Sequence, residues 1–236
     1  MALFWSLIFV DPLIILSTIL CGAVSIVVAL GDSRGRRPIK VGRVWARSIL
    51  RIARVRVTVE GLENIDPKVT CVLVSNHLSY MDTPVMLTHV PVDFRFMAKK
   101  GLFQIPFLGT HLKHAGHIPV PLEDPRASLR TLSHAAETIR EGGMSVLIFP
   151  EGGRSEDGIL QPFKEGAAYL AIKAGVPLVP LALIGTRDVL AMGSATFHKA
   201  PVTLRFAKPI PTEGLTLRDR QAVTDQIRAE IVRMLG

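Results

Sequence analysis

A histidine and an aspartate five residues apart carry the clearest catalytic signal in the sequence. His77 and Asp82 lie in the segment SNHLSYMD, directly after the apolar run TCVLV, which predicts a buried strand. A carboxylate bonded to one ring nitrogen of a histidine fixes the tautomer and stabilises the imidazolium that forms when the other nitrogen takes a proton. Asp82 could reach back to His77 across the start of the next helix. The alternative is structural, because Ser79-x-x-Asp82 also matches a capping box.

A second loop offers groups for an anionic ligand. The segment FPEGGRS, residues 149–155, follows the strand-like run SVLIF. Gly152 and Gly153 allow the backbone to approach a ligand closely, and Arg154 presents a planar fork that matches a phosphate. A glycine-rich turn with a solvated arginine is the commoner meaning of such a segment, so this loop is a weak signal on its own.

The elements that must position these loops alternate between strands and helices. Runs rich in β-branched residues predict strands at 55–60, 70–75, 92–97, 145–149, 178–184 and 202–206. Periodic apolar positions predict helices at 80–89, 125–141, 165–174 and 216–235. This alternation indicates an α/β domain with a mixed, largely parallel sheet flanked by helices. Both candidate loops follow predicted strands, where such sheets collect their chemistry.

Composition sets the class of protein. The chain has 236 residues, of which 48% are hydrophobic and 20% charged, so it is too apolar for a disordered chain and long enough for one α/β domain with an appendage. Its two cysteines, Cys21 and Cys71, cannot form a disulfide framework. Both lie in apolar runs, so we expect buried thiols in a reducing compartment.

The N-terminal quarter has the composition of a membrane anchor. Residues 13–30 carry no charge and would extend about 27 Å as a helix, close to the thickness of a bilayer core. Residues 31–60 then hold nine of the basic side chains against two acids, which accounts for +7 of the net charge of +8. One basic cluster after an apolar segment favours a membrane surface over nucleic acid and places the rest of the chain on the cytoplasmic side.

Two features of this quarter have alternative interpretations. Residues 13–30 could span the bilayer, or Asp11-Pro12 could split residues 2–30 into two short helices that dip into one leaflet; a buried core helix is a third possibility. Residues 39–55 place apolar side chains at helical spacing among arginines, with Trp45 suited to the headgroup level. They predict either an interfacial amphipathic helix or a helix packed on the domain with solvated arginines. The expected division is a membrane-embedded and interfacial segment, 1–54, followed by the α/β domain, 55–236.

The two loops together resemble a known family. N-H-x4-D at 76–82, followed some seventy residues later by F-P-E-G-x-R-S, resembles the glycerophospholipid acyltransferases, and in particular the bacterial 1-acyl-sn-glycerol-3-phosphate acyltransferases. AKKGLFQIPFLG at 98–109 resembles the acceptor-binding block of that family, PFKEGA at 162–167 the segment that follows, and VPLVPLA at 176–182 its fourth block. The resemblance runs from about residue 55 to 211, with order and spacing preserved.

The resemblance implies a reaction and a site. It implies acyl transfer from acyl-CoA or acyl-carrier protein to the free hydroxyl of lysophosphatidic acid, giving phosphatidic acid at a membrane, with His77 as general base and Asp82 orienting it. The chain has no G-x-S-x-G elbow, which favours direct transfer over a covalent acyl-enzyme. We expect membrane lipids as partners, no nucleic acid, no metal and no cofactor beyond the acyl donor. The residues expected to bind substrate or shape its loop are Asn76, Lys99, Lys100, Glu151, Gly152, Gly153, Arg154 and Ser155.

The sequence also departs from the family. Pro121 and Leu122 stand where members place an acidic residue or Asn and then Arg, and Gly101 and Gly153 stand where Glu and Thr are commoner. The missing arginine motivates a second acceptor, such as a lyso-ornithine lipid. A metal-dependent phosphoesterase that uses His77 and Asp82, or a non-catalytic membrane lipid-binding protein, are more distant alternatives. The spacing of His111, His114 and His117 fits metal ligands, but no Cys or carboxylate joins them, so we expect exposed or headgroup-facing side chains.

Overall fold

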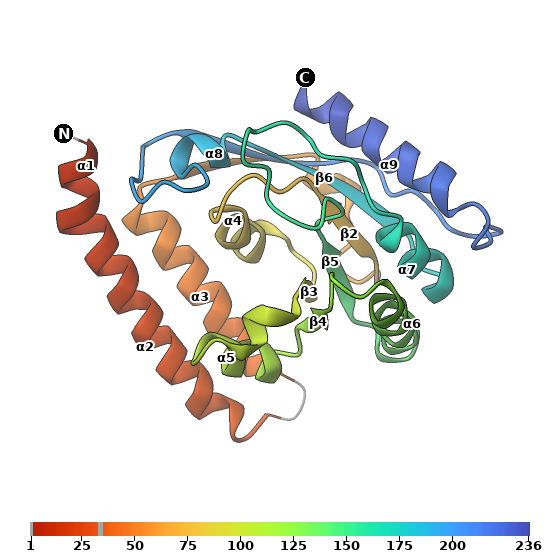
Figure 1. Cartoon of the computed structure of the whole chain (residues 1–236), viewed down its shortest axis with the longest axis horizontal. Coiled ribbons are helices and arrows are strands. Elements are labelled where there is room, and N and C mark those ends of the chain that lie inside the picture. The colour runs from red at the N-terminus through yellow and green to blue at the C-terminus, as the bar shows by residue number, and fades with distance from the viewer. Residues whose placement is uncertain (1, 33–34) are drawn as a thin grey trace.

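A largely parallel sheet forms the centre of the protein (Figure 1). The computed structural model describes residues 2–32 and 35–236, so Arg34 of the basic cluster lies outside the described residues. In the described part the sheet has seven strands in the order β1-β7-β6-β2-β5-β3-β4, and only β6 and β7 pair antiparallel. The strands are β1 (Arg56–Glu60), β2 (Val72–Ser75), β3 (Phe94–Lys99), β4 (Ile118–Val120), β5 (Ser145–Ile148), β6 (Leu178–Ile184) and β7 (Pro201–Phe206). The predicted mixed, largely parallel α/β sheet is therefore confirmed.

Helices cover both faces of this sheet. One apolar core lies between the sheet and α3 (Arg36–Ile52) and α4 (Asp82–His89), and a second lies under α6 (Pro125–Gly142), α7 (Gly166–Ala174) and α9 (Arg220–Leu235). Local signals set their ends: the Asp124 carboxylate caps α6 by accepting from the Ala127 N–H, and Gly143, at φ 64°, ends it. The shorter helical segments are η2 (Leu62–Asn64), η3 (Lys100–Gln104), α5 (Leu108–His114) and α8 (Thr186–Val189).

The predicted strands and helices are all present, and the missed elements have physical reasons. β4 has three residues and one proline, which the ladder tolerates because β4 is the edge strand beside β3. The seven residues of α5 are too few to show a helical period. The predicted helix 216–235 begins at Arg220, because the Asp219 carboxylate accepts from the Thr216 backbone N–H and closes a turn there.

The central strands explain how the two candidate loops meet. Every residue of β2 and β5 is buried, as expected for parallel strands covered on both faces. The two strands are neighbours, with Val74 of β2 opposite Ile148 of β5. The loops that follow them therefore leave the sheet side by side at the same edge.

The N-terminal segment is one continuous helix. α1 (Ala2–Trp5), η1 (Ser6–Val10) and α2 (Asp11–Ala29) follow one another without a break, so the predicted split at Asp11-Pro12 does not occur. η1 is a π-helical turn, which accommodates Pro12 at the start of α2 because the ladder there needs no proline N–H. Leu3–Ala29 is long and apolar enough to cross a membrane.

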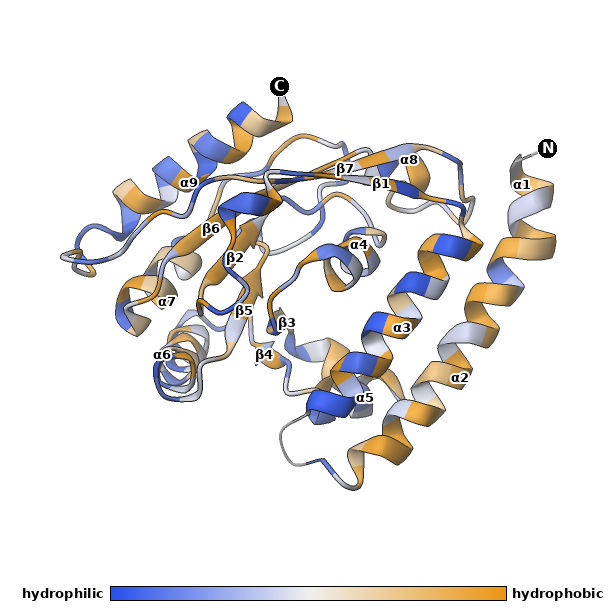
Figure 2. Cartoon of the chain, turned by 180° about the vertical axis from the view of Figure 1, so that it is seen from behind, coloured by the Kyte–Doolittle hydropathy of each residue, from blue (hydrophilic) through white to orange (hydrophobic). Residues whose placement is uncertain are grey.

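α3 lies between α2 and the domain, and it differs sharply from α2 in character (Figure 2). Trp45 of α3 donates to the Thr18 hydroxyl of α2 at 3.0 Å, while Ala46, Ile49 and Leu50 are buried against the sheet side. The basic side chains of α3 are mostly exposed. As one of the two interpretations of residues 39–55 predicts, this helix packs on the domain with most of its arginines exposed; the interfacial interpretation stays a prediction.

The cysteines occupy different environments. Cys71 is buried in the core at the start of β2, as predicted. Cys21 is half-exposed, so its predicted burial is wrong, because it lies on α2, most of whose apolar side chains face outward.

Gly61 tests how tightly the end of the sheet is packed. Its φ is 71°, and a Cβ there would lie 2.2 Å from the carbonyl oxygen of Phe206. Gly193 also has a positive φ, 76°, but a Cβ there would meet nothing within 4 Å. We expect Gly193→Ala to cost about 1 kcal/mol of backbone strain and Gly61→Ala about 3 kcal/mol or more.

Thermal unfolding in detergent measures the difference. With about 2–4 °C lost per kcal/mol in a chain of this size, the midpoint should fall by about 2–4 °C for Gly193→Ala and at least twice as far for Gly61→Ala. Equal losses for the two variants would show that the contact with Phe206 carries no cost.

Candidate functional site

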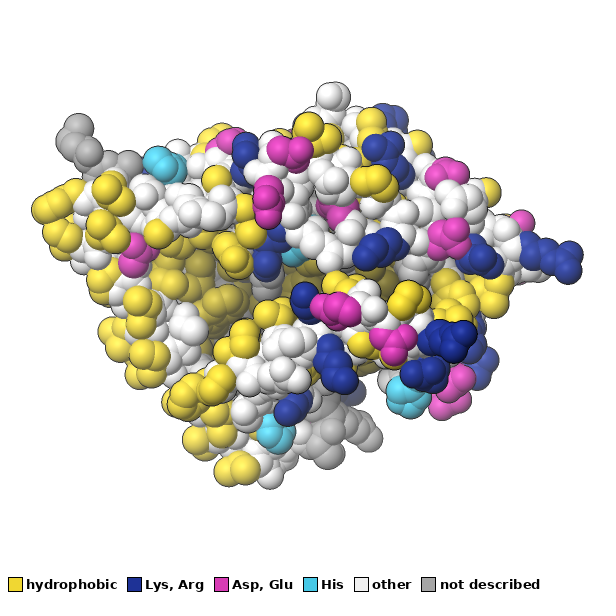
Figure 3. Space-filling model, in the orientation of Figure 1, with side chains coloured by type: hydrophobic (Ala, Val, Ile, Leu, Met, Phe, Trp, Pro, Cys, Tyr) yellow, Lys and Arg dark blue, Asp and Glu magenta, His cyan; other side chains and the backbone are white. Residues whose placement is uncertain are grey.

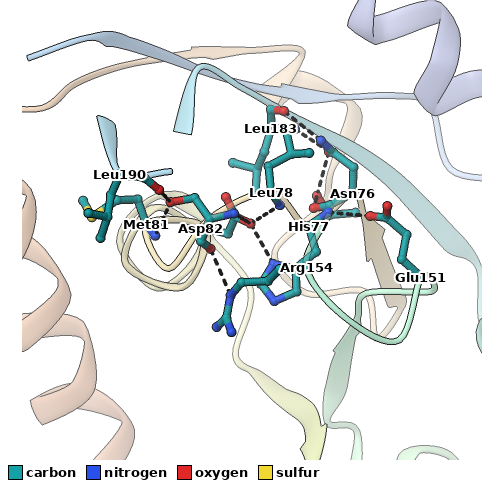
Figure 4. Close-up of polar contacts among 11 residues, drawn as sticks. Asn76, His77, Leu78, Met81, Asp82, Glu151, Arg154, Leu183 and Leu190 are labelled. Carbon is teal, nitrogen blue, oxygen red and sulfur yellow. Dashed lines mark hydrogen bonds and ion pairs between the residues drawn. The ribbon is translucent and has the colours of Figure 1, made fainter. Parts of the chain in front are cut away.

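The two candidate loops are hydrogen-bonded to each other around one residue. The His77 backbone N–H donates to the Glu151 carboxylate at 2.7 Å, and the His77 carbonyl accepts from the Ser155 N–H at 2.9 Å. Figure 4 shows the resulting cluster at the carboxyl ends of β2 and β5. The backbone of the histidine is thus fixed from both sides by the second loop.

The side chain of His77 is held by Asp82. The distance between His77 Nδ1 and Asp82 Oδ2 is 2.7 Å, and the Leu78 and Ser79 backbone N–H groups donate to the same oxygen at 2.7 and 2.9 Å. An oxygen that faces three nitrogens in this way accepts from all of them, so Nδ1 carries the proton. The other ring nitrogen, Nε2, is then an acceptor with no partner in residues 2–32 and 35–236.

The capping interpretation of Asp82 holds in part. Asp82 does accept from the Ser79 N–H, as in a capping box. The reciprocal bond is missing, because the Ser79 hydroxyl instead accepts from the Met81 N–H and donates to the Leu190 carbonyl. Asp82 is fully buried and serves both the loop backbone and the imidazole.

The imidazole stacks on an aromatic ring. The centroids of the His77 and Phe149 rings are 3.8 Å apart, and the rings are within 8° of parallel. This burial lowers the pKa of His77 below its usual value, Asp82 acts in the opposite sense, and Arg154 lowers the pKa further. His77 is 8% exposed and neutral near pH 7, the state in which Nε2 can accept a proton.

Arg154 places a cation beside this imidazole (Figure 4). Its Nε donates to the Ser79 carbonyl at 3.3 Å, and its guanidinium carbon lies 4.3 Å from the centroid of the Tyr80 ring. The two terminal nitrogens have no hydrogen-bond partner in the described part of the chain. They are left to bind an anionic group close to His77.

Glu151 shapes the second loop from within. One oxygen accepts from the His77 N–H and the other from the Gln161 N–H at 2.8 Å. Burial raises the pKa of this carboxyl, and the two N–H donors lower it. Next to it, Gly152 has a φ of 78°, which favours glycine at this position; a Cβ there would also displace the flexible ammonium end of Lys164, 2.7 Å away.

Two residues expected at the substrate have their polar atoms occupied by the protein. The Asn76 amide is fully buried and both donates to and accepts from the backbone of Leu183, at 2.9 and 2.8 Å, which ties the loop to β6. The Ser155 hydroxyl donates to Asp157 and accepts from the Gly158 N–H. The structure gives both residues a positioning role.

The lysines expected at the substrate point toward β4 and are not bonded to the His77 cluster. Lys99 pairs with Glu123 at 2.8 Å, and both side chains are exposed. Lys100 lines a separate cavity of about 450 Å³ together with Lys113 and His117. Gly153, in contrast, is open on the outer side of its loop, where a Cβ would meet nothing within 4 Å.

The three spaced histidines do not form one metal-binding group in the described residues, although the ring centroids of His111 and His117 are 6.1 Å apart. His117 is buried rather than exposed, because its Nδ1 accepts from the Phe96 backbone N–H at 3.0 Å, and this burial lowers its pKa to about 3. His111 Nδ1 lies 2.6 Å from the Ser25 hydroxyl of α2, while His114 is exposed. The expectation of exposed side chains therefore holds only for His114. His111 contacts α2, and His117 contacts β3 of the sheet.

Sequence reasoning missed the partners that lie far away along the chain. Phe149 was named only as part of its loop, although its ring stacks on that of His77. Gln161 and Leu183 act through backbone groups, which leave no signal in residue type.

The matches to known proteins cover the part of the chain that holds the two loops. The family model described as Acyltransferase matches residues 56–184. The chain is 38% identical over 172 residues, 72% of its length, to "1-acyl-sn-glycerol-3-phosphate acyltransferase BAT2, chloroplastic" of Brassica napus, of which it covers 49%. It is 32% identical over 197 residues to "1-acyl-sn-glycerol-3-phosphate acyltransferase alpha" of Homo sapiens, covering 83% of this chain and 70% of that protein. The chain thus spans about half the length of the chloroplast relative.

A solved structure has the same fold. The crystal structure of the 1-acyl-sn-glycerophosphate (LPA) acyltransferase PlsC from Thermotoga maritima superposes with a TM-score of 0.81, covers 98% of this chain and 93% of its own, and is 24% identical in sequence. Because this comparison covers nearly the whole chain, it includes the N-terminal helices as well as the sheet.

Glu151→Gln tests whether the carboxylate holds the two loops. A glutamine has one acceptor oxygen, so one of the two backbone N–H groups would face an amide N–H instead. We expect a loss of about 2 kcal/mol and a fall in the thermal midpoint of about 4–8 °C. Glu156→Gln, in the same loop but exposed, is the matched control and should leave the midpoint unchanged. A midpoint for Glu151→Gln equal to that of the control would refute the role.

Proposed function

The chain belongs to the acyltransferase family, and we propose that it transfers a fatty acyl group from acyl-CoA or acyl-carrier protein to the sn-2 hydroxyl of 1-acyl-sn-glycerol-3-phosphate. The product would be phosphatidic acid. The observation that carries this proposal is the unpartnered Nε2 of His77 beside the free guanidinium end of Arg154. The names of the relatives support the same substrate.

The geometry of His77 supports its proposed role as the base for an alcohol nucleophile. Nε2 of His77 takes the hydroxyl proton as the oxygen attacks the thioester carbonyl, and Asp82 stabilises the resulting imidazolium. As the carbon–sulfur bond breaks, the imidazolium returns the proton to the departing thiolate. The acyl group thereby moves directly to the acceptor oxygen, with no covalent enzyme intermediate and no cofactor beyond the donor.

Arg154 is the proposed ligand of the acceptor phosphate. The hydroxyl and the phosphate of a lysophosphatidate are only a few bonds apart, so a phosphate-binding group must lie close to the base. Arg154 meets this condition, and Glu151 and Gly152 shape the loop that carries it. Lys99, which pairs with Glu123, and Lys100, which lines the separate cavity, lie outside the hydrogen-bonded His77 cluster and are not part of this proposed phosphate contact.

The residues that depart from the family pattern motivate a second acceptor. Pro121 and Leu122 are half-buried and uncharged, so the segment after β4 offers no cation of its own at these positions. With Arg154 as the main anion ligand, a lyso-ornithine lipid remains the alternative acceptor.

We propose that α2 lies within one leaflet, with the domain on the cytoplasmic face. α3 runs along α2, and its exposed side chains include Arg36, Lys40, Arg47 and Arg51. A spanning α2 would carry these charges into hydrocarbon at about 2.5–3.5 kcal/mol each. Lying flat, α2 buries its apolar side while α3 meets anionic headgroups. The lipid acceptor then need not leave the membrane, a transfer costing about 0.8 kcal/mol per methylene.

Turnover with defined acceptors tests the function. Purified protein with acyl-CoA should acylate lysophosphatidate in preference to a lyso-ornithine lipid, and His77→Ala should lower kcat about 10²–10⁴-fold. His134→Ala, an exposed histidine on α6, is the control and should retain full activity. Preference for the lyso-ornithine lipid would transfer the assignment to that acceptor. No turnover of either by the wild type would defeat the proposal.

The pH profile reports the state of His77. Because its pKa lies below the ordinary value, the neutral base predominates at pH 7, and kcat should fall as the pH drops below about 6.5. Asp82→Asn removes the group that raises this pKa, so the acidic limb should move to lower pH while the plateau falls by about 10²-fold or more. An acidic limb that moves to higher pH in Asp82→Asn would contradict the assignment.

A further inference from the structure

A short apolar turn projects from the fold next to the N-terminal helix. It connects η3 to α5, and together with the adjoining residues of these two helices it exposes four large apolar side chains: Leu102, Ile105, Phe107 and Leu108. Phe107 is the most exposed of them, at 72%. Clusters of this kind on a soluble surface mark a contact with a partner or a membrane.

The backbone of this turn is strained in a way that fixes the phenyl ring outward. The Leu108 N–H donates to the Pro106 carbonyl at 2.7 Å, and Phe107 has φ 63° and ψ −53°, the rare γ-turn conformation. Gly109 allows the backbone to pack closely under the turn, because a Cβ there would lie 2.2 Å from the Phe103 carbonyl oxygen. Strain of this kind persists where the surroundings over-determine it and is typical of functional segments.

The turn is continuous with the apolar surface of α2. α5 packs on α2, where the Ser25 hydroxyl lies 2.6 Å from His111 Nδ1. Figure 3 shows hydrophobic side chains gathered along the side of the molecule that α2 forms, and α5 packs on that helix. A membrane that receives α2 therefore meets this turn as well.

Cations lie directly behind the apolar tip. Lys100 and Lys113 line the cavity of about 450 Å³ with Gln104 and His117, and no acidic side chain lines it. Neither ammonium has an ion pair in the described residues. Since Nδ1 of His117 accepts from the Phe96 N–H, the proton of this neutral ring is on Nε2, a further donor for an anion. Such a set of donors matches a phosphate.

We propose that the η3–α5 turn is a second membrane contact, in which Phe107 enters the acyl layer and the Lys100–Lys113 cavity receives the phosphate of an anionic phospholipid. The turn and α2 would then anchor the domain at two places, which fixes its orientation as well as its distance from the bilayer. The proposal rests on membrane association of α2 and is independent of the acyl acceptor.

Depth-dependent quenching tests the apolar tip in the full-length protein. Phe107→Trp, with the wild type as background for Trp5 and Trp45, should be quenched by brominated lipids in vesicles of phosphatidylglycerol and phosphatidylcholine. Val232→Trp, on the exposed side of α9, is the matched control and should not be quenched. An unquenched Phe107→Trp in protein that is bound to the vesicles would overturn the proposal.

Vesicle partitioning tests both parts by affinity. Phe107→Ser should weaken binding about tenfold, and Val232→Ser should not change it. Lys113→Gln should weaken binding to anionic vesicles about fivefold and leave binding to neutral vesicles unchanged, whereas Lys208→Gln, exposed near α9, should have no effect. Equal effects of the two lysine variants would overturn the headgroup site. Because these measurements need no turnover, their failure is distinct from failure of the proposed reaction.

Discussion

The convergence of three N–H groups on one oxygen of Asp82 is the interaction on which the site depends. A buried carboxylate needs donors, and here they come from the imidazole of His77 and from two successive backbone groups, Leu78 and Ser79. The loop must therefore wrap around the carboxylate to satisfy this oxygen, and in doing so it fixes the tautomer of the histidine; the other oxygen, Oδ1, is buried without a partner among the described residues. Loop shape and proton position are set by the same contact, so neither can change without the other.

The parallel sheet supplies the second constraint. Because β2 and β5 are adjacent, the two loops leave the sheet together, and Glu151 and Ser155 then bond the backbone of His77 from the opposite side. Burial of the ring against Phe149 keeps His77 neutral, while Arg154 brings a positive charge that disfavours its protonation. The arrangement keeps a neutral base close to a cation, because burial and the nearby positive charge both disfavour the imidazolium.

The sequence predicted correctly those features that are determined by residues close together along the chain. The strands, the main helices and the pairing of His77 with Asp82 follow from apolar runs, caps and spacing, all of which are visible within a few residues. Asn76 and Lys99 could not be placed this way, because their partners, Leu183 and Glu123, are brought to them by the topology of the sheet. The same holds for His117, whose burial depends on β3. The γ-turn at Phe107 was missed for a different reason, since a strained backbone has no residue-type signature when glycine is absent.

The unequal burial of the two cysteines gives the molecule a built-in reporter. Burial raises the pKa of Cys71 to about 11, so its thiolate, the form that reacts with electrophiles, is scarce at neutral pH. Cys21 lies partly exposed on α2, the helix that is long and apolar enough to cross a membrane. Alkylating reagents thus discriminate between the interior of the domain and its N-terminal helix without any engineered label, and protection of Cys21 by vesicles would report the proposed attachment of α2 to a bilayer.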